Sequence, residues 1–100
     1  KNQSLGLKPL DESQMANMFR AHRVWDATMA HSIIDALDSE IERIVHIVGS
    51  FHSDFNGGLL KELRAREPDI VILVISIRKR KSISLLAGDE SRADIIVYSQ

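Results

Sequence analysis

The sequence predicts a small α/β domain in two or three layers, with one long N-terminal helix and a small, mainly parallel sheet. Apolar residues recur at three- and four-residue steps from about residue 12 to 39, which is the period of an amphipathic helix. Two β-branched runs, 44–48 and 70–77, flank a short helical stretch at 59–66. A strand, a helix and a strand in this order require a right-handed crossover, so we expect a βαβ unit with a parallel pair.

The composition fits one globular domain. The chain has 100 residues, of which 44% are hydrophobic and 27% charged, and both fractions are ordinary for a folded protein. A formal net charge of −1 gives no global field that would attract nucleic acid, so no nucleic-acid partner is expected. The absence of cysteine excludes disulfides and thiolate-bound metals. No apolar run reaches the roughly 18 residues of a membrane span.

The other segments are shorter. Asp11 or Ser13 can cap the long helix, because a side-chain oxygen there accepts from an unpaired backbone N–H. A loop is expected at 49–58, a basic and solvated loop at 78–81, and a third strand at 93–98. A sheet this thin leaves an edge that normally pairs. We therefore expect either a second copy of the chain or the rest of a parent protein to cover it.

The loop at 49–58 contains the strongest candidate for chemistry, His52. Ligands of open parallel sheets bind beyond the carboxyl ends of the strands, and this loop leaves the predicted strand at that end. Gly57 and Gly58 open the next helix, whose free N–H groups could hold a carboxylate or phosphate. His52 is therefore either a functional ligand or an exposed histidine that caps a turn.

Asp26 and His22 lie with Trp25 on the predicted inner face of the long helix. A carboxylate on that face needs a partner to offset its desolvation. A contact between Asp26 and His52 would fix the tautomer of the imidazole, which is a common supporting role beside a ligating histidine. The alternative is an ion pair between Asp26 and a nearby arginine. A histidine such as His22 is more often a hydrogen-bonded core residue than a ligand.

The remaining titratable residues favour structural roles. His46 is expected inside a strand and His31 on the solvent side of the helix. Asp54 could bind a cation, but a role in capping the following turn is favoured. Met15, Met18 and Met29 could face a soft metal, yet methionines at helical spacing usually fill a core.

Three motifs occur in an order that resembles a known family. The helical stretch 18–30 contains Asp-x-x-Met-Ala from Asp26, the stretch 45–52 is a β-branched run followed by Gly-x-x-His, and 93–98 is a terminal strand. Together they resemble the C-terminal part of the ChaN-like haem-binding lipoproteins, which are related to the Tiki and erythromycin-esterase groups. The chain departs from the family where Ser50 and Phe51 replace Asn-Gly before His52. His22 and Trp25 likewise stand where relatives often have Gln and Arg.

The resemblance implies haem binding linked to iron uptake, in a lipoprotein of the bacterial envelope that only an upstream lipid anchor attaches to the membrane. His52 would be the iron ligand and Asp26 would orient it. The supporting residues would be His22, Ser50, Asp54 and Tyr98. One alternative is a metal-dependent hydrolase of the Tiki or esterase type, with a divalent metal on His52. The other is a non-catalytic interaction module, and binding is favoured over catalysis.

The whole chain, 1–100, is expected to form a single domain. It starts at Lys1 without a methionine, and residues 1–10 are a polar lead-in. We therefore expect an excised C-terminal fragment of a larger ChaN-like protein, whose N-terminal half would supply further site residues.

Overall fold

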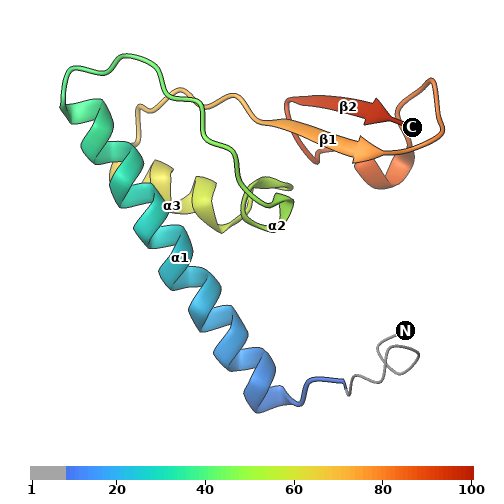
Figure 1. The fold of residues 1–100 in the computed structure, drawn as a ribbon, viewed down its shortest axis with the longest axis horizontal. Helices are drawn as coiled ribbons and strands as arrows, with labels where there is room; N and C mark the ends of the chain where they lie inside the picture. The colour runs from blue at the N-terminus through green and yellow to red at the C-terminus, as the bar shows by residue number, and fades with distance from the viewer. Residues whose placement is uncertain (1–8) are drawn as a thin grey trace.

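A computed structural model describes residues 9–100 (Figure 1), so most of the expected lead-in lies outside the described residues. Its elements, in chain order, are α1 (Glu12–Asp38), α2 (Ser50–Ser53), α3 (Gly58–Arg66), β1 (Ile75–Lys79), the 3₁₀ helix η2 (Ala87–Asp89) and β2 (Ile95–Ser99). β1 and β2 form a two-stranded parallel sheet, from Ile75 opposite Ile95 to Lys79 opposite Ser99. The predicted class, a small α/β domain with a long N-terminal helix and a small parallel sheet, is confirmed.

α1 begins at a capping box. The Asp11 carboxylate accepts from the Gln14 N–H at 2.7 Å, and the Gln14 side chain accepts from the Asp11 N–H at 3.0 Å. The C-terminal half of α1 packs against α3, whereas its N-terminal half projects beyond the rest of the molecule (Figure 1). The Cα radius of gyration is 16.3 Å, above the roughly 13 Å of a compact domain of this length.

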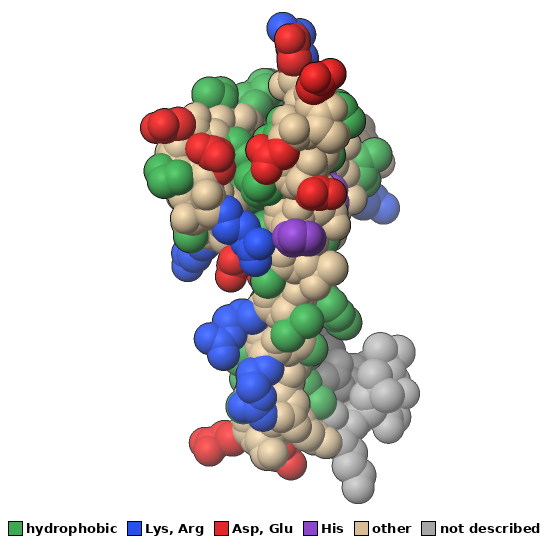
Figure 2. All heavy atoms as spheres, turned by 90° about the vertical axis from the view of Figure 1, so that its left-hand side faces the viewer, with side chains coloured by type: hydrophobic (Ala, Val, Ile, Leu, Met, Phe, Trp, Pro, Cys, Tyr) green, Lys and Arg blue, Asp and Glu red, His purple; other side chains and the backbone are tan. Residues whose placement is uncertain are grey.

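Apolar side chains lie along the projecting half of α1, in the narrow lower part of Figure 2. Met15, Met18 and Phe19 are 42%, 40% and 50% exposed, so two of the three methionines predicted as core filler face solvent. Within residues 9–100, no helix combines the length and the apolar character that crossing a membrane requires.

The core lies between α1 and α3. Its buried members are Ala30, Leu59 and Leu63, and the side chains packed against them are Met29, Ile33, Ile34, Val48, Ile70 and Ile72. Burying a leucine fully contributes about 1.5–3 kcal/mol, so the two leucines make this contact a main source of stability. The core therefore joins the two helices to the extended segments that lead toward α2 and β1.

The strand predicted at 44–48 is not formed, and this prediction is wrong. The segment is irregular; Val48 packs on the core, whereas Val45 and Ile47 are 91% and 93% exposed. His46, predicted inside a strand, is an exposed residue of this segment. A strand needs a neighbour for its ladder hydrogen bonds, and no segment among the described residues pairs with this one.

The two later strands are present with shifted bounds. The run predicted to begin at 70 becomes a strand only at Ile75, where β2 supplies a partner. β1 consequently extends to Lys79, so Arg78 and Lys79 lie on a strand and not in the predicted basic loop. The strand predicted at 93–98 is confirmed as β2. The parallel connection runs through η2 instead of an α-helix, so the predicted βαβ unit is replaced by a later strand pair.

One face of the extended chain around the sheet is apolar and uncovered. Val71, Leu73, Ile75 and Ile77 are 96%, 64%, 55% and 68% exposed, while Val74 and Ser76 between them are buried. The register places Ile95 and Val97 beside Ile75 and Ile77 on the same face. We call these six residues the outward aliphatic face. Parallel sheets are usually covered on both faces, and the described residues cover only one.

Candidate functional site

His52 and Asp26 form the centre of the site. His52 lies in α2, and not in a loop as predicted, while Asp26 lies on α1. His52 Nδ1 and Asp26 Oδ1 are 2.5 Å apart, and their side chains are 13% and 6% exposed. An ionised carboxylate only accepts hydrogen bonds, so beside one a neutral His52 would hold its proton on Nδ1 and leave the lone pair of Nε2 for a ligand. The predicted contact is present, and Asp26 pairs with this histidine instead of an arginine.

Two glycines make this contact possible. Gly57 lies so close to α2 that a Cβ there would be 2.5 Å from the carbonyl oxygen of His52. A Cβ at Gly58 would collide with Oδ2 of Asp26. Gly58 is the first residue of α3, where the helix dipole favours a negative charge. The carboxylate beside this helix start is thus that of Asp26.

Aromatic side chains surround His52. The ring of His22 lies 5.1 Å from Trp25, 4.4 Å from Phe51 and 5.3 Å from His52, measured between centroids. Trp25 and Phe51 are 55% and 59% exposed. We call His22, Trp25 and Phe51 the aromatic patch. Nδ1 of His22 is buried without a hydrogen-bond partner, so His22 is not the fully hydrogen-bonded core residue that its position favours.

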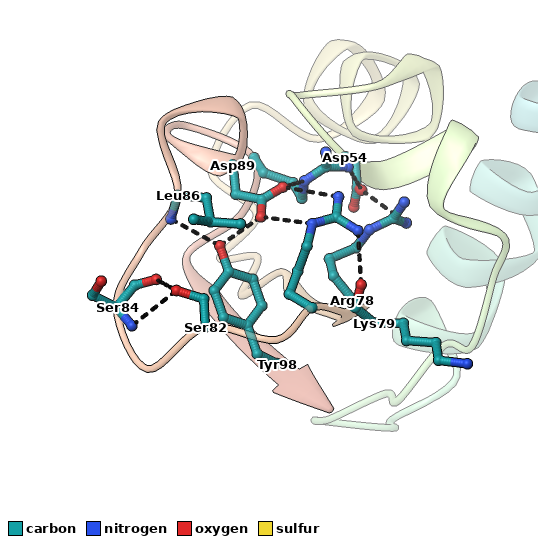
Figure 3. Close-up of polar contacts among 10 residues, drawn as sticks. Asp54, Arg78, Lys79, Ser82, Ser84, Leu86, Asp89 and Tyr98 are labelled. Carbon is teal, nitrogen blue, oxygen red and sulfur yellow. Dashed lines mark hydrogen bonds and ion pairs between the residues drawn. The ribbon is translucent and has the colours of Figure 1, made fainter. Parts of the chain in front are cut away.

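Asp54 and Tyr98, both labelled in Figure 3, belong to a second group of contacts, and so does Ser50. Asp54 Oδ2 accepts from Arg92 Nη1 at 2.6 Å and lies 3.8 Å from Arg78 Nη1, and Ser50 Oγ accepts from Arg78 at 3.1 Å. Tyr98 donates to Asp89 Oδ2 at 2.5 Å. We call this group the arginine–aspartate cluster; its members are Ser50, Asp54, Arg78, Arg80, Asp89, Arg92 and Tyr98. Asp54 is the C-cap residue of α2, and its side chain forms ion pairs with these arginines.

The comparison with protein families decides the family. A model of the family described as "Haem-binding uptake, Tiki superfamily, ChaN" matches residues 2–63, more than half of the chain. The chain belongs to this family. The resemblance read from the sequence is therefore confirmed. Among curated proteins and solved structures, no significant match was found.

Of the residues predicted for the site, this ChaN-family chain brings three together at His52, namely His52, Asp26 and His22. The other three lie in the arginine–aspartate cluster. Across residues 9–100, no group of three or more His, Cys, Asp or Glu side chains is arranged to hold a metal ion.

Sequence reasoning missed most of the arginine–aspartate cluster. Asp89, which is 1% exposed, accepts from Tyr98, from Arg92 Nε at 2.8 Å and from Arg80 Nη2 at 3.5 Å. The basic run at 78–81 was visible but predicted to be solvated. A β-strand alternates its side chains, so Arg78 and Arg80 could have been placed on one side of it. No local pattern marks Asp89.

The cluster shifts three proton equilibria. The hydrogen bond from Tyr98, with those from the arginines, lowers the pKa of Asp89 below its usual value. The hydrogen bond to Asp54 raises the pKa of Arg92. Burial, together with the hydrogen bond to Asp89, raises the pKa of Tyr98. The folded ChaN-family chain therefore favours an ionised aspartate, a charged arginine and a neutral tyrosine in contact.

Stability is expected to fall on both sides of neutral pH. The contribution of Asp89 is present above its unfolded pKa of about 3.9 and is lost as pH falls through the lowered folded value. That of Tyr98 is present below about pH 10 and is lost as pH rises through the raised folded value. Urea midpoints between pH 2 and 11 measure both slopes. Tyr98 is the only tyrosine, so its ionisation can be followed by absorbance. An alkaline slope that persists in Tyr98→Phe would contradict the assignment.

Proposed function

We propose that the chain binds haem, with Nε2 of His52 as an axial ligand of the iron. The observation that carries the proposal is the imidazole held through Nδ1 by a buried carboxylate, 2.5 Å away. A neutral histidine is a common axial ligand, and a carboxylate on its other nitrogen fixes the ring and raises its basicity. Asp26 is thus a positioning residue, and His52 is the residue that would touch the iron.

The aromatic patch fits the rest of the group. Haem has two parts: an iron ion, which an imidazole nitrogen can bind, and the flat apolar macrocycle that surrounds the iron. Trp25 and Phe51 present more than half of their surface to solvent beside His52. Flat aromatic faces pack well against another flat π-system. The buried, unpartnered Nδ1 of His22 adds a polar atom that a bound molecule or water could satisfy.

The description of the family supports a proposal about the biological setting. The family is described as one of haem-binding uptake, and we propose that this chain serves haem or iron uptake as part of an envelope lipoprotein with an upstream lipid anchor. The outward aliphatic face supports the further proposal that a second copy, or other residues of the parent protein, cover it.

A haem titration tests the proposal. Ferric haem added to the protein is expected to give a saturable Soret shift. It should also quench the fluorescence of Trp25, the only tryptophan, whose ring lies 6.5 Å from that of His52. Both signals should saturate at the same haem concentration. Protoporphyrin without iron is the matched control, because it can stack on the aromatic patch but cannot bind Nε2.

The absence of a saturable Soret shift would contradict haem binding. Metal analysis of the protein would then test the hydrolase alternative, in which His52 holds a divalent ion. A Soret shift without Trp25 quenching would place haem away from the aromatic patch and contradict the proposed site.

A further inference from the structure

We propose that Arg92 is a positioning residue, which holds the turn after α2 and thereby fixes His52 for its ligand. The inference rests on the proposed function for the identity of that ligand. Asp26 and Arg92 act on different parts of the site: Asp26 fixes the imidazole ring of His52, and Arg92 fixes the backbone that presents that ring.

α2 cannot hold its own position. It comprises only Ser50–Ser53, and no side chain caps its N-terminus. A single helical turn is unstable in water, because ordering its residues costs more than its few hydrogen bonds return. The place of His52 must therefore be set by contacts from other elements.

Arg92 contacts the chain just after α2 in three ways. Its guanidinium donates to Asp54 at 2.6 Å, and both side chains are largely buried, at 13% and 7% exposed. Its carbonyl oxygen accepts from the Phe55 N–H at 2.8 Å. Its guanidinium carbon also lies 4.6 Å from the centre of the Phe55 ring, within the range of a cation–π contact.

The turn that Arg92 contacts is strained. Phe55 and Asn56 have φ angles of 55° and 54°, a left-handed conformation that asparagine adopts readily but that is unfavourable for a bulky residue such as Phe55. Such a conformation persists where the surroundings determine it. The contacts of Arg92 hold Phe55 in this conformation. Arg64 donates to Asn56 Oδ1 at 3.1 Å.

Arg92 is in turn fixed to the sheet. Its Nε donates to Asp89 at 2.8 Å, and Asp89 accepts from Tyr98 of β2 at 2.5 Å, as Figure 3 shows for the labelled Asp54, Asp89 and Tyr98. Arg92 thus uses separate nitrogens for two carboxylates, which the single ammonium of a lysine cannot reproduce. A continuous set of contacts therefore joins β2, through Asp89 and Arg92, to Asp54, the residue that follows α2.

The test compares Arg92→Gln and Asp54→Asn with Arg66→Gln. Arg66 is a matched control, since it pairs with Glu62 on α3 at 3.4 Å, is 36% exposed and forms no hydrogen bond or ion pair with α2 within residues 9–100. Two quantities are measured: the haem dissociation constant, and the NMR shift of the His52 Nδ1–H proton in protein without haem. Arg92→Gln and Asp54→Asn are each expected to weaken haem binding by about 10- to 100-fold and to shift the proton signal. Arg92→Lys should not restore either quantity.

The double variant Asp54→Asn/Arg92→Gln should lose less haem affinity than the sum of the two single losses, because both substitutions remove the contact between Arg92 and Asp54. Additive losses, or an unchanged proton signal in folded Arg92→Gln, would overturn the positioning role. If the unsubstituted protein fails to bind haem while the proton signal moves only in the Arg92 and Asp54 variants, the positioning role is supported and the proposed function fails. Should Arg92→Gln not fold, the nearly isosteric Asp54→Asn provides the same two measurements.

Discussion

Replacing His52 by alanine is expected to remove the axial ligand and the Soret shift that reports it. The loss of haem affinity should exceed the roughly 10- to 100-fold that follows from removing only a hydrogen-bond partner of a metal ligand. Asp26, 6% exposed at its side chain, would also lose the group that offsets its burial. The measurement is a haem titration of the unsubstituted protein and of the variant, monitored by Soret absorbance and Trp25 fluorescence.

His46→Ala is the matched control for this prediction, because His46 is an exposed histidine on the irregular segment before α2. It should bind haem as the parent does. Residual quenching of Trp25 in His52→Ala would show haem stacked on the aromatic patch without its axial bond. An unchanged Soret band and affinity in His52→Ala would rule out His52 as the ligand.

Replacing Gly57 by alanine is expected to destabilise the fold by about 1–3 kcal/mol, the usual range for forcing extra atoms into a packed region. The added Cβ would lie 2.5 Å from the carbonyl oxygen and 2.7 Å from the carbonyl carbon of His52. These are backbone atoms, so no side-chain rotation relieves the collision and α2 must move. Urea denaturation measures the change in the free energy of unfolding.

Gly49→Ala is the control. Gly49 and Gly57 are both N-cap residues that form no side-chain cap, and a Cβ at Gly49 would meet nothing within 4 Å. Any general effect of alanine at a helix start is therefore shared, and the difference between the two variants isolates the contact with His52. Equal stabilities would show that α2 does not lie against Gly57 in solution.

The two longer helices, α1 and α3, were predictable because their signals are local. α1 follows from the three- and four-residue apolar steps and from the capping residue Asp11, and α3 from the short helical stretch at 59–66 that Gly57 and Gly58 open. The strand at 44–48 failed because its β-branched residues indicate an extended chain, while a strand also requires a partner that a local pattern cannot supply. The same reason moved the start of β1 from 70 to Ile75.

The site shows the same division. The contact between Asp26 and His52 could be predicted as one of two alternatives, because a carboxylate on an inward helical face needs a partner and His52 was expected in a nearby loop. Arg92 could not be assigned, since its contact with Asp54 spans 38 residues and its contact with Asp89 has no periodic signal. Long-range charge pairs depend on the tertiary path of the chain, which neither residue's neighbours record.

The family match ends at residue 63, but some residues that form ion pairs with the matched region lie beyond residue 63. Asp54 lies inside the matched region, and both of its cationic partners, Arg78 and Arg92, lie beyond it. A shortened chain that stopped at the limit of similarity would retain Asp26 and His52 but lose both arginines that pair with Asp54. The family match therefore ends before the residues that neutralise the charge of Asp54.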